Sequence, residues 1–114
     1  MNASKSQLKT GISEELAFIT EALQAEMDAI GSVVSRLATS EVDLQTWTKA
    51  VDMLEQCSGH AVFSGMGKSG LIGAKLSATY SSIGQPSHVV HPAEAVHGDL
   101  GSIRRDDVVI LMSY

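Results

Sequence analysis

The chain has 114 residues, a formal net charge of −5 and an apolar content of 44%, which suits one small globular domain. No run reaches the ~18 apolar residues that span a bilayer, the first residues lack the apolar segment of a secretory signal, and no basic stripe with stacking aromatic residues indicates a nucleic-acid interface. The single cysteine, Cys57, excludes an internal disulfide and is expected to be a small buried side chain. These observations predict a cytoplasmic protein that uses neither a membrane nor a nucleic acid as its partner.

The negative charge is confined to the first half of the chain. Residues 1–55 contain nine acidic and four basic residues, whereas residues 56–114 contain four of each. An anionic ligand would therefore have to be attracted by a local site in the second half.

An apolar stripe runs along the first 37 residues at spacings of three and four. Its members are Leu8, Ile12, Leu16, Ile19, Leu23, Met27, Ile30, Val34 and Leu37. This period predicts one long helix, with Gly31 as a candidate bend. Two interpretations remain open, since the stripe suits both a helix that packs on its own domain and a helix that pairs with another copy.

A second helix is predicted from Asp43 to Cys57, where Ser58 and Gly59 stop it. Its expected inward-facing residues are Leu44, Trp47, Val51 and Leu54. Residues 1–58 are thus predicted to form packing or oligomer helices, and residues 59–114 a separate core.

The second half changes period and predicts an α/β fold. Short apolar strands are expected near 60–64, 86–90 and 108–112, with a helix from Ser69 to Ile83 that ends at Gly84. Strand, helix and strand in this order indicate a parallel sheet with a right-handed crossover. If the first strand lies between the other two, the turn after it meets Ser113 at the edge where α/β proteins bind ligands.

The turn after the first strand reads Gly65-Met66-Gly67-Lys68-Ser69-Gly70. Glycines let the backbone approach an anion, the following helix adds the positive end of its dipole, and Lys68 adds a full charge. A tight turn that binds nothing is the plain alternative. Strand, glycine turn, Lys-Ser and helix together favour anion binding.

Two familiar nucleotide sites do not fit the neighbouring residues. A triphosphate loop needs glycine at the position of Val62. A dinucleotide site needs an acidic residue near the end of the second strand, and none appears before Glu94.

The run from "VFSGMGKSG" to "HPAEAVHGDLG" and on to the end of the chain resembles the sugar isomerase (SIS) domain and, within it, the D-arabinose 5-phosphate isomerase family. The resemblance covers residues 60–114. It implies the N-terminal half of a three-layer sandwich around a parallel sheet, of which about three strands are present, preceded by two helices. Leu71 and Ser102 stand where the family frequently has His and Met.

The resemblance also implies an activity and a partner. The family interconverts D-ribulose 5-phosphate and D-arabinose 5-phosphate for the acid sugar of lipopolysaccharide or capsule, without a cofactor, and is usually a homo-tetramer. The alternatives are a sensor module that binds a phosphosugar without catalysis, and an isomerase of another phosphosugar. His97 in its His-Gly-Asp setting favours the enzyme.

Residue roles carry over from the matching motifs. Lys68 and His97 are the implied catalytic residues, and the implied substrate-binding residues are Gly65, Gly67, Lys68, Ser69, His91, Glu94 and Ser113. The isomerisation passes through an enediol, which needs an acid–base group and an electrophile for the oxyanion. The division of these roles between Lys68 and His97 stays open.

The loop His91–Asp99 also contains possible metal ligands. His91 and His97 would lie on different sides of a helix, so no metal is expected, and His91 and Glu94 are expected to orient the loop. His60 and His88 are expected to be structural, and Arg104 and Arg105 to form a solvated turn.

The family's second ligand loop begins at Ser113, and its further carboxylate and histidine lie beyond Tyr114. The chain is therefore expected to be part of a domain that is inactive alone. The apolar strand at 108–112, left at an open sheet edge, and the helix stripe predict that it associates.

Overall fold

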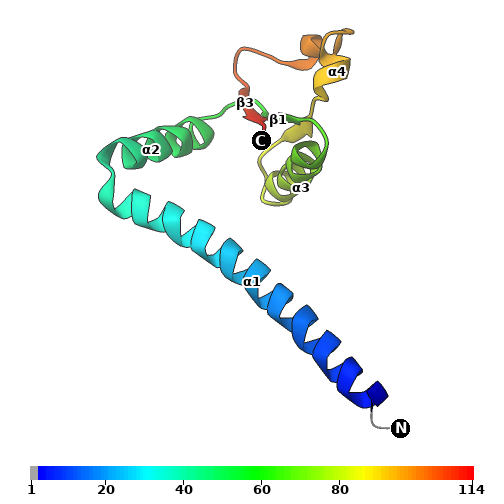
Figure 1. The fold of residues 1–114 in the computed structure, drawn as a ribbon. Coiled ribbons are helices and arrows are strands. Elements are labelled where there is room, and N and C mark those ends of the chain that lie inside the picture. The colour runs from blue at the N-terminus through cyan, green and yellow to red at the C-terminus, as the bar shows by residue number, and fades with distance from the viewer. Residues whose placement is uncertain (1–2) are drawn as a thin grey trace. The chain divides into compact units, whose positions relative to one another are not determined.

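The computed structural model describes the backbone of residues 3–114 and the side chains of residues 13–114. Figure 1 labels the elements in chain order. They are α1 (Ala3–Thr39), α2 (Glu41–Glu55), β1 (Ala61–Gly65), α3 (Lys68–Ser82), β2 (Ser87–Val89), α4 (Pro92–Ala95), the 3-10 helix η1 (Asp99–Ser102) and β3 (Val108–Met112). The chain divides into two compact units, Met1–Trp47 and Thr48–Tyr114, and each is described by itself.

The first unit consists of α1 and the start of α2. The predicted long helix is confirmed, and it continues through Gly31. The turn between the helices is fixed by Ser40, whose Oγ accepts a hydrogen bond from the Asp43 amide at 3.2 Å, and by Arg36, which donates Nε and Nη2 to the Asp43 carboxylate at 2.9 and 3.0 Å. The hydrogen bond from the Arg36 guanidinium holds the pKa of Asp43 below its usual value.

The apolar stripe of α1 is exposed. Leu16, Leu23, Ile30 and Val34 are between 58% and 66% exposed, so no other described element of the first unit covers them. The spacing of the apolar residues determines which face of α1 is apolar, and this exposed face can pack against another protein surface.

The second helix begins and ends two residues earlier than predicted, at Glu41 and Glu55. The prediction that its apolar residues face inward is wrong for three of four, because Leu44, Trp47 and Val51 are more than half exposed while Leu54 is half-buried. Amphipathic spacing aligns apolar side chains on one face without providing a surface for them to pack against.

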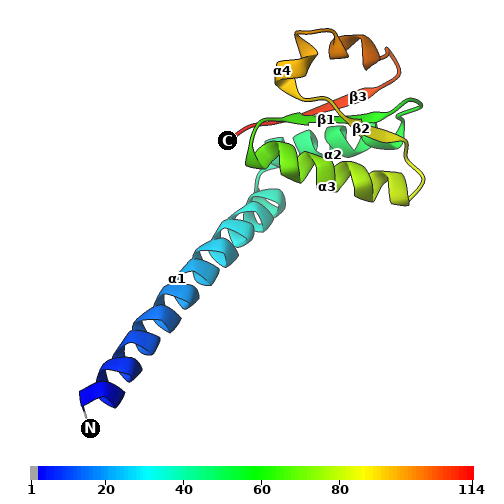
Figure 2. The ribbon, with the colours of Figure 1, turned by 90° about the vertical axis from the view of Figure 1, so that its right-hand side faces the viewer.

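The second unit contains a three-stranded parallel sheet in the order β2-β1-β3, as predicted. Side chains alternate across β1, so Phe63 faces α3, where its ring meets Tyr80 at 5.3 Å, while Val62 and Ser64 face the segment with α4 and η1. Figure 2 shows α3 on one side of the sheet and this segment on the other. These three layers confirm the α/β fold class.

The core of this unit centres on β1, which is buried from end to end. Ala61, Val62, Phe63 and Val90 are its buried apolar residues. β3 pairs only with β1 among the described strands, and its Leu111 is 78% exposed. The predicted apolar edge strand is therefore confirmed.

The amino-terminal ends of β1 and β3 are joined by polar contacts. The Asp107 carboxylate accepts hydrogen bonds from the amides of His60, at 2.7 Å, and Arg104, at 2.6 Å. The rings of His60 and His88 meet edge to face at 5.4 Å, so both histidines are structural, as predicted. Arg104 and Arg105 lie in an exposed turn, also as predicted.

Cys57 differs from its prediction. It is a free, half-buried cysteine. Its Sγ lies 3.7 Å from the Asp106 carbonyl oxygen, because the end of α2 leads directly into the polar junction of β1 and β3.

Substitutions at two glycines with opposite surroundings test the packing at the start of the sheet and the exposure of α1. A Cβ at Gly59 would overlap Asp107 Oδ1 and lie 2.6 Å from the Asp106 carbonyl oxygen, whereas a Cβ at Gly31 meets nothing within 4 Å. We expect Gly59→Ala to lower the thermal midpoint of the second unit. Gly31→Ala should raise the helix content and stabilise α1 by up to about 1 kcal/mol. Thermal unfolding followed by circular dichroism measures both, and equal effects of the two substitutions would contradict the structure.

Candidate functional site

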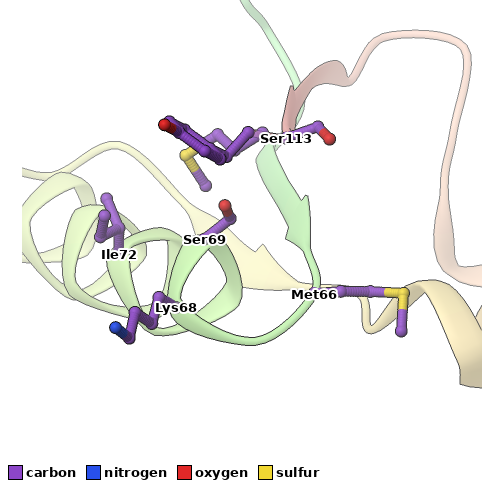
Figure 3. A pocket seen from close by; sticks show the side chains of 7 residues that line it. Met66, Lys68, Ser69, Ile72 and Ser113 are labelled. Atoms are coloured by element: carbon purple, nitrogen blue, oxygen red, sulfur yellow. The ribbon is translucent and has the colours of Figure 1, made fainter.

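A cavity of about 840 Å³ opens at the carboxyl ends of β1 and β3. Three segments line it: the turn after β1, the first turns of α3 and the residues after β3. Its lining residues are Met66, Lys68, Ser69, Ile72, Met112, Ser113 and Tyr114. In Figure 3 the Ser69 side chain points toward the segment that carries Ser113, the Ser113 hydroxyl points away from Ser69, and the Lys68 side chain extends outward from the first turn of α3.

The turn that forms one wall depends on glycine. Gly67 has φ +57°, a left-handed conformation that other residues rarely adopt. A Cβ at Gly70 would lie 2.6 Å from the Gly65 carbonyl oxygen, and a Cβ at Gly65 would lie 2.9 Å from that of Met112. The backbone of β1, the start of α3 and the end of β3 therefore meet in contact that admits no side chain.

The start of α3 is open to an acceptor. Gly67 is its N-cap residue and makes no side-chain capping bond to the first amides of the helix. These amides carry the positive end of the helix dipole, and Lys68 is adjacent to them. None of the residues that line the cavity has a carboxylate side chain. The electrostatics of the cavity therefore favour an anion such as a phosphate monoester.

The structure brings some of the predicted site residues together. Lys68, Ser69 and Ser113 line the cavity, and Gly65 and Gly67 shape the turn beside it. The sheet order is the reason, because β1 lies next to β3 and both strands end at the same edge.

The other three predicted residues lie elsewhere. His91 is the N-cap of α4, where its Nδ1 accepts a hydrogen bond from the Ala93 amide at 3.2 Å. Glu94 lies within α4, and the amide of the exposed His97 donates to its carbonyl oxygen at 2.9 Å. None of the three lines the cavity, so the described chain does not bring His97 to Lys68.

The apolar part of the cavity was not predicted. Met66, Ile72, Met112 and Tyr114 contribute side chains to it. Ile72 follows Lys68 by one helical turn, which was the available signal. Methionine and isoleucine at such positions are indistinguishable from core residues in a sequence alone.

Two further features of the described residues bear on the class of protein. No group of three or more His, Cys, Asp or Glu side chains within residues 13–114 could hold a metal ion. None of the described helices is both long and apolar enough to cross a lipid bilayer.

Comparison with known proteins matches the chain to one domain family and to relatives that share one name. Residues 53–114 match the SIS domain. The chain is 46% identical over 93 residues to the arabinose 5-phosphate isomerase KpsF of Escherichia coli, covering 74% of this chain and 28% of KpsF. It is 44% identical over 105 residues to the arabinose 5-phosphate isomerase KdsD of Pseudomonas aeruginosa, covering 90% of this chain and 30% of KdsD.

A solved structure agrees with these sequences. The chain matches a protein of E. coli CFT073, determined in complex with arabinose 5-phosphate, with a TM-score of 0.64 and 41% identity over 85% of this chain and 50% of that protein. The chain thus spans less than a third of these curated relatives and half of the solved structure. Because the SIS domain matches more than half of its residues, and the fold agrees with that match, the chain belongs to the SIS domain family.

Proposed function

We propose that this protein is a phosphosugar isomerase that interconverts D-ribulose 5-phosphate and D-arabinose 5-phosphate. The observation that carries the proposal is the cavity, where Lys68, Ser69 and Ser113 lie at the start of a helix whose N-cap residue, Gly67, makes no side-chain capping bond. Relatives named arabinose 5-phosphate isomerase and a solved relative in complex with arabinose 5-phosphate support the choice of sugar. The product would supply the acid sugar of lipopolysaccharide or capsule.

The cavity divides into a part for the phosphate and a part for the sugar. The amides at the start of α3 and the hydroxyls of Ser69 and Ser113 are hydrogen-bonding groups suited to a phosphate or a sugar hydroxyl. Met66 and Ile72 add apolar side chains to the lining of the cavity. Lys68 supplies the positive charge, either to the phosphate or to the oxyanion of the enediol.

Proton transfer between C1 and C2 needs a group whose pKa lies near neutrality, and histidine has such a pKa. His97 is proposed for this role on the strength of its motif. His91 and Glu94 are proposed to orient the segment that carries it, consistent with the capping hydrogen bond of His91. The reaction requires no redox cofactor and no metal. In this proposal, residues 1–58 form packing or oligomer helices, and residues 59–114 form the first half of the phosphosugar-binding core.

The protein expressed from its natural reading frame should convert D-ribulose 5-phosphate to D-arabinose 5-phosphate. Lys68→Met should abolish most of the turnover and weaken phosphosugar binding, because it removes the cation of the cavity. Lys75→Met, two turns further along the same helix and outside the cavity lining, is the matched control and should behave like the wild type. Product formation by coupled assay and binding by calorimetry measure the two effects. Tight binding of D-arabinose 5-phosphate with no turnover would instead identify a sensor module.

His97→Ala tests the acid–base assignment. If His97 transfers the proton, kcat should fall by about 10²–10⁴-fold while the thermal midpoint stays close to that of the wild type, since the side chain is exposed. The pH dependence of kcat between pH 5 and 9 should also lose the inflection that a catalytic histidine produces. Near-normal turnover by this variant would make His97 a structural residue.

We further propose that the protein forms a homo-oligomer through the exposed stripe of α1. Leu23→Glu places a charge within the stripe, and Ala25→Glu places the same charge on the opposite face of the helix. Sedimentation should show an oligomer for the wild type and for Ala25→Glu, and dissociation for Leu23→Glu. A wild-type monomer at micromolar concentration would contradict this part of the proposal.

A further inference from the structure

A buried carboxylate lies at the end of the sheet away from the cavity, and the proposed reaction does not use it. The Asp107 side chain is 0% exposed. Its oxygens accept hydrogen bonds from the amides of His60 and Arg104, and Oδ1 lies 3.4 Å from His60 Nδ1. The hydrogen bond from the His60 amide, and then that from Arg104, hold the pKa of Asp107 below its ordinary value. The group is therefore a carboxylate at neutral pH.

The carboxylate joins two segments that are distant in sequence. His60 is the residue before β1, and Arg104 opens the turn that leads to β3. The same junction contains hydrogen bonds from the Gly59 amide to the Asp106 carbonyl and from the Val108 amide to the His60 carbonyl, each 3.0 Å long. The absence of a side chain at Gly59 lets these groups approach. The start of β3 is thereby fixed against the start of β1.

The position of the start of β3 determines the position of its end. The register runs without a break from Ala61↔Val108 to Gly65↔Met112, and β1 is the only strand paired with β3 within the described chain. Five paired residues correspond to about 16 Å of strand. Ser113 follows Met112 directly, so its distance from Lys68 and Ser69 depends on where β3 lies along β1.

The carboxyl end of β3 has little room to shift along β1. The close approach of the Met112 carbonyl to Gly65 fills the space that a methyl group would need. A displacement of β3 would open this contact and move Ser113 out of the cavity wall. A charge-assisted bond to two amides at the far end is a strong way to prevent it.

We propose that Asp107 is a positioning residue of the phosphosugar cavity, which acts through β3 by fixing Ser113 opposite Lys68 and Ser69. The identity of the ligand rests on the proposed function, whereas the coupling between Asp107 and the cavity wall does not. Asp107 touches neither the cavity nor a ligand.

Asp107→Asn tests the inference. The asparagine side chain has the same size, but its NH2 group is a donor and faces one of the two backbone amides that the carboxylate accepted from. One of the two hydrogen bonds by which residue 107 joins the strands is therefore lost. We expect its dissociation constant for D-arabinose 5-phosphate to rise about tenfold, within the roughly 10²-fold that a misplacement of 1 Å can cost. Hydrogen exchange of the Ile110 and Met112 amides, which face β1 in the register that begins with the Val108 amide on the His60 carbonyl, should accelerate in the absence of ligand.

Two controls separate positioning from a general loss of stability. Asp106→Asn makes the same charge change at an exposed neighbour and should match the wild type in binding and exchange. Tyr80→Ala removes the ring that packs on Phe63 and should lower the thermal midpoint while binding at a temperature well below the midpoint stays normal.

The exchange measurement decides the inference even if the wild type binds no D-arabinose 5-phosphate, an outcome that would contradict the proposed function. Wild-type exchange at Ile110 and Met112 in Asp107→Asn would overturn the positioning role. Equal exchange and equal binding loss in Asp107→Asn and Tyr80→Ala would also overturn it, because the role would then be general stability.

Discussion

The pairing of β1 with β3 is the interaction on which the rest of the second unit depends. It places Gly65 beside Met112, and from that contact the glycine turn, the start of α3 and Ser113 converge on one cavity. The contact is possible because Gly65 and Gly70 have no side chains where three backbone segments meet. A parallel sheet brings the carboxyl ends of neighbouring strands to one edge, so a ligand site at this edge follows from the topology.

The chain also presents apolar surface that it does not cover. The stripe of α1 and the outer residues of β3 are exposed, and an edge strand with Leu111 78% exposed invites association. The cavity is lined by Lys68 with no carboxylate opposite it, whereas the first half of the chain carries the negative charge. The division of charge between the halves therefore agrees with an anion site in the second unit.

Much of the fold was predictable, because short-range rules control it. Apolar spacing of three and four and continuous apolar runs located α2, α3 and the three strands to within two residues, whereas α4 and η1 lie in a segment predicted as a loop. The continuous apolar strands also indicated parallel pairing. Gly67, Lys68 and Ser69 were predicted as a site because glycines and a cation at a helix start favour an anion. The motif with His97 identified a family, yet the described chain does not bring His97 into the cavity.

The sequence by itself determined the main element types, the glycine turn with its adjacent Lys68, and the family, because these depend on residues close together in the chain. Only the tertiary structure decided which apolar faces are covered, that Met66 and Ile72 line the cavity, and that Asp107 joins β1 to β3. Those features depend on contacts between residues as far apart as His60 and Asp107. The spacing of residues along a chain carries no information on such contacts until the strands are paired.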